Sequence, residues 1–132
     1  MEALLQRFDD FVFPHPNGTF LIDPSSYSMS LSTDSAGQRW AGFDVDAQLA
    51  RIDLSDSSRW IYEFGGSLTR FEEAAWVGPH HFVVVGSLDQ TLFCKWIDIK
   101  SPQRRSWRMT LPPEEKSWNY IQAKLDRLGI RY

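Results

Sequence analysis

The chain has 132 residues, of which 42% are hydrophobic and 23% are charged, and its formal net charge is -3. This length and composition predict a single globular domain over residues 1–132 and exclude a fibrous or low-complexity chain. Its one cysteine excludes an internal disulfide, and no secretory signal or apolar run of about 18 residues is found. We therefore expect a cytoplasmic protein that does not enter a membrane.

Apolar residues at helical spacing predict a short N-terminal helix within residues 2–12, which ends before the prolines of residues 13–18. Short runs of alternating apolar and polar residues, separated by turn residues, then predict nine strands. These strands cover residues 19–22, 27–31, 39–46, 49–54, 59–64, 74–77, 81–85, 91–99 and 105–111. The last is expected at a sheet edge, with Trp107 and Met109 facing inward and Arg108 outward.

A C-terminal helix is predicted after Pro112 and Pro113, because proline fits the first helical turn. Its apolar stripe consists of Trp118, Ile121, Leu125 and Leu128, and Gly129 is placed to cap its end. The predicted fold is therefore mainly β, of the α+β class. It is a single antiparallel meander or twisted sheet system of about eight or nine short strands, with the short N-terminal helix and the C-terminal amphipathic helix packed on it.

The centre of the chain has a recurring order of strands and turns. Trp76 ends one strand, Gly78-Pro79 turns the chain, an apolar strand ends at Gly86, and the next strand closes on Trp96-Ile97-Asp98. In this order residues 73–99 resemble one blade of a WD-type β-propeller, although isoleucine separates the Trp and Asp of the signature pair. A propeller needs at least four blades of about 40 residues. The resemblance therefore implies either a local three-stranded meander or assembly with further copies of the chain.

Charge is distributed unevenly, since residues 1–90 hold 5 basic and 13 acidic residues and residues 91–132 hold 9 basic and 4 acidic residues. Acidic residues in two neighbouring segments, with two tryptophans as anchors, form the candidate partner-binding site: Asp44, Asp46, Asp53, Asp56, Trp40 and Trp60. Such a surface favours a basic protein partner. The small, acidic, cysteine-poor β domain is similar in composition to bacterial immunity proteins. That resemblance implies an antitoxin-type protein that neutralises a basic toxin by covering its active site.

Catalytic and cofactor motifs are missing from the sequence, including the nucleophile elbow, the phosphate-binding loop and Cys-x-x-Cys. His15, His80, His81 and Cys94 do not suit one metal ion, because adjacent histidines on a strand point to opposite faces. We therefore expect a noncatalytic protein-binding module without cofactor or metal, and the acidic net charge argues against nucleic acid. Two alternatives remain: a small-ligand-binding β domain or small enzyme with His80 or His81 in a pocket, and a propeller-like subunit that forms a homo-oligomer.

Overall fold

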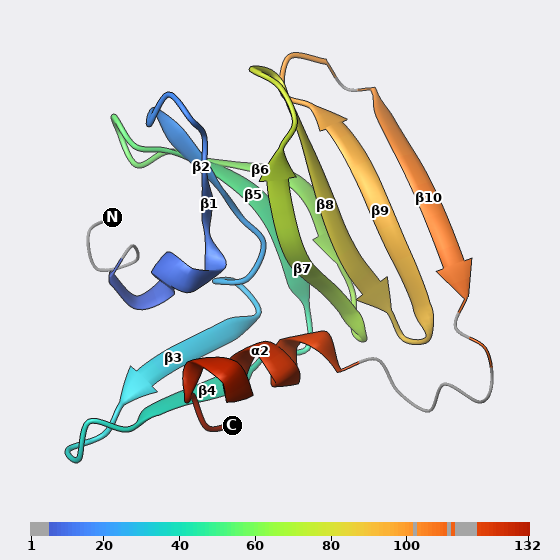
Figure 1. Ribbon diagram of the computed structural model, residues 1–132. Helices are drawn as coiled ribbons and strands as arrows, with labels where there is room; N and C mark the ends of the chain where they lie inside the picture. Colours follow the sequence, from blue (N-terminus) through green and yellow to red (C-terminus); the bar gives the residue numbers. More distant parts are fainter. Residues whose placement is uncertain (1–5, 102, 111, 113–118) are drawn as a thin grey trace.

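The computed structural model describes the whole chain except residues 1–5, 102, 111 and 113–118 (Figure 1). Residues 6–8 form a helical turn that continues as the 3-10 turn η1 (Asp9–Phe11), and the C-terminal helix is α2 (Tyr120–Leu128). The strands are β1 (Phe13–Pro14), β2 (Phe20–Asp23), β3 (Met29–Thr33), β4 (Arg39–Phe43), β5 (Ala47–Asp53), β6 (Arg59–Gly65), β7 (Thr69–Trp76), β8 (His81–Leu88), β9 (Thr91–Asp98) and β10 (Arg104–Thr110). The mainly β, antiparallel prediction is confirmed. Leu111, Pro113 and Trp118, which were assigned to the last strand and helix, lie outside the described residues.

The prediction of one continuous sheet system is wrong, because the described strands form three sheets. Sheet A has the order β1-β2-β5-β6, sheet B is the β3-β4 hairpin, and sheet C has the order β10-β9-β8-β7. Only sheet C is the simple meander of consecutive strands that was expected, and Figure 1 shows it running from β7 to β10 at the outer edge. Sheet B is separate from sheet A because β2 pairs with β5 and not with β3, the next strand in the sequence.

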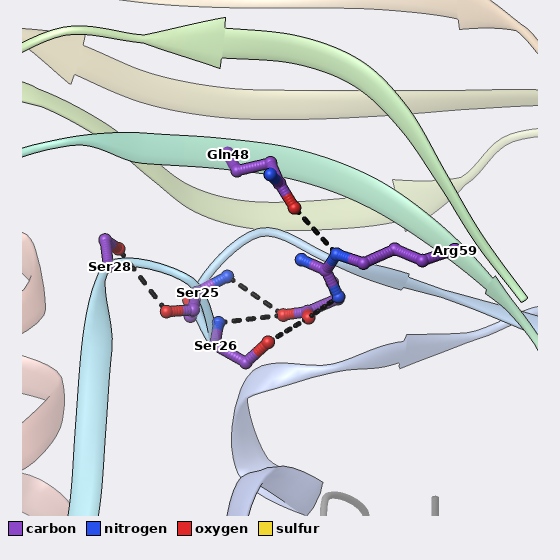
Figure 2. A network of polar contacts seen from close by, with 6 residues as sticks. Ser25, Ser26, Ser28, Gln48 and Arg59 are labelled. Atoms are coloured by element: carbon purple, nitrogen blue, oxygen red, sulfur yellow. Dashed lines mark hydrogen bonds and ion pairs between the residues drawn. The ribbon is translucent and has the colours of Figure 1, made fainter. Parts of the chain in front are cut away.

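A buried turn explains why the chain leaves sheet A after β2. The Asp23 side chain is fully buried, and its Oδ1 accepts the backbone N–H groups of Ser25 and Ser26 at 3.1 and 2.9 Å. Its Oδ2 accepts the Ser26 hydroxyl and forms an ion pair with Arg59 of β6 at 2.8 Å. The Arg59 Nε–H also donates to Gln48 of β5 at 2.6 Å, so the turn is tied to two strands of sheet A (Figure 2).

The first core cluster lies between sheet A and the facing side of sheet C. Sheet A contributes Ile22, Ala47 and Leu49, and sheet C contributes Phe71, Ala74, Phe82, Val84, Phe93 and Ile97. Gly86 belongs to the same layer, since a Cβ atom there would lie 2.5 Å from Cζ of Phe93 and 2.1 Å from the carbonyl oxygen of Arg70. This position requires glycine because an aromatic ring and a backbone carbonyl occupy the side-chain space.

The second core cluster covers the opposite face of sheet A. Leu21 and Ile52 of that sheet pack with residues of the N-terminal segment, sheet B and α2, namely Phe8, Phe11, Val12, Met29, Leu31, Ile121, Leu125 and Ile130. The Lys124 ammonium of α2 lies 2.8 Å from the Glu73 carboxylate of β7, and the Tyr120 hydroxyl donates to the same carboxylate. Gly129 ends α2 in the left-handed conformation, at a φ of 72°, which confirms the predicted cap. The central strands of sheet A, β2 and β5, are thus buried on both faces, whereas the edge strand β6 is largely exposed.

Candidate functional site

The four candidate aspartates lie in two pairs. Asp44 and Asp46 precede β5, whereas Asp53 ends that strand and Asp56 lies in the turn that follows. A seven-residue strand separates the pairs by about 20 Å, at about 3.3 Å per residue. The structure therefore does not bring the four carboxylates together in one patch, although they are close in sequence.

Three of these carboxylates accept hydrogen bonds from their own turns. Asp44 accepts the backbone N–H of Val45, and Asp56 accepts that of Ser58, at 3.0 and 2.9 Å. Asp53 accepts both the hydroxyl and the backbone N–H of Ser55, at 2.6 and 2.9 Å. These bonds, the hydroxyl first, hold the pKa of the Asp53 carboxyl below its usual value. Short-range bonds of this type shape turns, so they give these aspartates a local structural role.

The two candidate tryptophans belong to different sheets. Trp40 lies on β4, where its indole N–H donates to Asp34 at 3.0 Å and the Arg131 guanidinium lies 5.8 Å from its ring. The bond from Trp40 is the main cause that lowers the pKa of the Asp34 carboxyl. Trp40 thus helps to hold the C-terminal residues against sheet B. Trp60 lies on β6, one of the two edge strands of sheet A, and is 61% exposed.

His15 and His81 lie in different surroundings. His15 is buried, with its Nε2–H donating to the carbonyl of Pro79 at 3.0 Å and its Nδ1 accepting the N–H of Asn17. His81 instead lines an open hollow of about 470 Å³ at one end of sheet C. Its Nε2 is 3.6 Å from the Asp98 carboxylate, and its ring centroid is 5.3 Å from that of Trp96. Gln103, Arg104 and Arg105 complete the wall of this hollow.

The predicted orientation of β10 is wrong. The register pairs Arg104 with Ile97 and Arg108 with Phe93, and both β9 residues face the core against sheet A. Residues paired directly across antiparallel strands share a face, so the two arginines lie on the side of sheet A. Trp107 and Met109 therefore lie on the other face and are 53% and 58% exposed.

We call the face of sheet C turned away from sheet A its outer face. By the same register it carries His81, Val83, Val85, Leu92, Cys94, Trp96, Asp98, Arg105, Trp107 and Met109. Beside the His81 hollow, this face has an apolar groove of about 400 Å³. Its lining includes Val85, Leu92, Cys94, Trp107 and Met109, with Tyr120 of α2 at its border. Indole, thioether and guanidinium groups are thus gathered on one sheet face.

No protein-family model, curated protein or solved structure matches this chain. The WD-type and immunity-type resemblances accordingly stay predictions. Within the described ranges, no group of three or more His, Cys, Asp and Glu side chains is arranged to hold a metal ion. A search of the same residues finds no helix with the length and apolar character needed to span a membrane.

Proposed function

We propose that the protein is a noncatalytic protein-binding module that holds an acidic partner protein on the outer face of sheet C. The observation that carries this proposal is the exposure of Trp96, Trp107 and Met109 beside Arg105 on one face of a regular sheet. Tryptophan, methionine and arginine are enriched at protein interfaces, and tryptophan and arginine supply a large share of their binding energy. A contiguous exposed apolar surface with a polar border is typical of an interaction site.

Charge selects the kind of partner. β10 has the sequence Arg-Arg-Ser-Trp-Arg-Met-Thr, so it carries three arginines and no acidic residue. Asp98 on the outer face lies next to His81 and accepts the backbone N–H of Lys100. Glu72, which lines the apolar groove, is buried and accepts the Ser87 hydroxyl at 2.8 Å. A partner that brings carboxylates to this surface gains complementary charge and a faster encounter rate. The proposed partner is thus acidic, whereas the acidic run in the sequence predicted a basic one.

The immunity-type hypothesis belongs to the same class of function but uses a different surface. It requires a basic toxin bound by the aspartates at the ends of β5, together with Trp40 or Trp60. Two variants separate the hypotheses: Arg105→Glu with Trp107→Ala on the outer face, and Asp44→Lys with Asp46→Lys before β5. Each is used to capture partners from the native host's lysate after circular dichroism has verified its fold.

The proposal predicts that a protein captured by the wild type is also captured by the aspartate variant but not by the outer-face variant. After purification, the captured protein should bind the wild type directly. Retention by the outer-face variant and loss with the aspartate variant would assign the function to the acidic pairs. Exposed substitutions of this kind cost little stability, on the order of 0.5 kcal/mol. Loss of binding is therefore attributable to the surface.

The His81 hollow supports a second candidate function, the binding of a small anionic ligand with a planar ring. The Trp96 indole offers a stacking surface, and Arg105 and His81 supply hydrogen-bond donors. Phenyl phosphate is a suitable probe, with inorganic phosphate as the control that lacks a ring. Amide shifts confined to the hollow, and absent in Trp96→Ala, would support this candidate, whereas unchanged spectra at millimolar probe would discard it.

A further inference from the structure

The edge strands of the two four-stranded sheets differ in how well they can accept another strand. β10 pairs with β9 at all seven of its residues without a register shift. β7, at the opposite edge of sheet C, has a register shift between Phe71 and Glu73 in its pairing with β8. β6, an edge strand of sheet A, pairs with β5 with a register shift between Leu49 and Ala50. The remaining edge strand, β1, has only two residues, one of which is proline. Among these described edges, β10 alone is both long and regular.

A regular edge strand presents unpaired backbone N–H and C=O groups, which form a template for another strand. Proteins usually block such an edge with a bulge, a proline, a very short strand or charged side chains. Between residues 104 and 110, β10 has only the last of these, its three arginines. All seven residues of β10 are exposed, and within the described part of the chain β9 is its one paired neighbour. The edge is therefore geometrically ready for strand addition.

The charge of β10 decides what can be added. Two copies of the chain joined through this edge would bring six arginines together without a carboxylate from either strand, which costs electrostatic free energy. Behind the edge, the Glu63 carboxylate of β6 is already paired with the Lys95 ammonium of β9. This ion pair has no net charge, and it therefore does not compensate the charge of the arginines. An acidic strand removes the repulsion and supplies the missing counter-charges.

We propose that an extended acidic segment of the partner adds to β10 as a fifth strand of sheet C. This inference rests on the proposed function and states its binding mode, in which main-chain bonds give affinity and alternate side chains give specificity. The register predicts the pattern of that segment. Side chains on the side of sheet A meet Arg104 and Arg108 and are acidic, while those on the outer face lie beside Trp107 and Met109 and are apolar.

The experiment uses a capped peptide of four Glu-Val repeats as the probe and four Lys-Val repeats as the charge control. Two further peptides carry N-methyl groups on every Glu or on every Val. A strand added at an edge uses the N–H groups of alternate residues, so one methylated peptide should lose at least about tenfold in affinity and the other should keep it. Affinity is measured by fluorescence anisotropy, and the contact is located by amide shifts of β10.

The expected results are binding of the Glu-Val peptide, no binding of the Lys-Val peptide, and a loss of at least about tenfold in Arg104→Glu with Arg108→Glu. Equal binding of both methylated peptides, or no binding of the parent peptide, overturns strand addition. If strand addition is overturned but the outer-face variant still fails to capture a lysate protein that the wild type captures, the proposed function stands without strand addition as its binding mode. If no captured protein depends on the outer face, the proposed function fails as well. A dimer in sedimentation that dissociates on Ser106→Pro would assign the edge to a second copy.

Discussion

Arg59→Met tests the polar network that directs the chain out of sheet A. The substitution removes the ion pair with the fully buried Asp23 at 2.8 Å and the bond to Gln48 at 2.6 Å, while keeping much of the side-chain volume. A hydrogen bond between charged groups contributes about 1.5–3 kcal/mol and a bond to a neutral amide about 0.5–1.5 kcal/mol. The Arg59 side chain is 30% exposed, so water replaces part of what is lost. We expect a loss of about 2–3 kcal/mol in the free energy of unfolding.

Urea unfolding followed by circular dichroism measures this loss, with Arg105→Met as the matched control on an exposed strand. The control should change stability by no more than about 0.5 kcal/mol. A double-mutant cycle with Asp23→Asn should give a coupling energy of at least about 1 kcal/mol, because the two groups contact each other. A loss below about 0.5 kcal/mol, or strictly additive variants, would show that the network does not stabilise the fold.

Three further predictions concern the cores and α2. Leu125→Ala should cost about 2–5 kcal/mol in urea unfolding because Leu125 is fully buried in the second core, and a negligible loss would remove α2 from that core. Gly86→Ala should cost more than about 2 kcal/mol, whereas Gly66→Ala, with no atom within 4 Å of its added Cβ, should be nearly neutral; equal effects would contradict the crowding at Gly86. Burial, and then the bond to Glu73, raises the pKa of Tyr120 to about 12, so its contribution to stability is complete below pH 10 and disappears as the pH rises through 12. The stability advantage of the wild type over Tyr120→Phe should shrink over that range, and a constant difference would refute this assignment.

The positions of the strands were predictable because their signals are local. Alternating side chains and turn residues determine where a strand begins and ends, and each of the nine predicted strands has a counterpart in the structure. The division into three sheets was not predictable in the same way. It depends on a hydrogen-bonded turn around Asp23 and on an arginine 36 residues later in the chain.

The candidate site was harder to predict, because a surface depends on how strands pair. Four aspartates within 13 residues of sequence suggested one patch, but β5 places them in two pairs at its opposite ends. Trp107 and Met109 were assigned to the core because they are large and apolar. The register of β9 decides otherwise, since Phe93 and Ile97 already fix which face of sheet C is inner. The side chains of β9 were the available signal, and using it requires the pairing of β9 with β10.

The distribution of burial explains why recognition is assigned to sheet C. The central strands of sheet A, β2 and β5, are enclosed by sheet C on one face and by the N-terminal turn, sheet B and α2 on the other, so they serve the two cores. The edge strand β6 exposes Trp60, Ile61 and Phe64, but its pairing with β5 is irregular. Sheet C packs against a core with one of its faces only. Large apolar side chains exposed on its second face, such as Trp107 and Met109, lower solubility without adding to the cores, and they lie beside a regular basic edge. A partner strand on that edge would extend the sheet and cover those side chains, which gives one physical reason for both features.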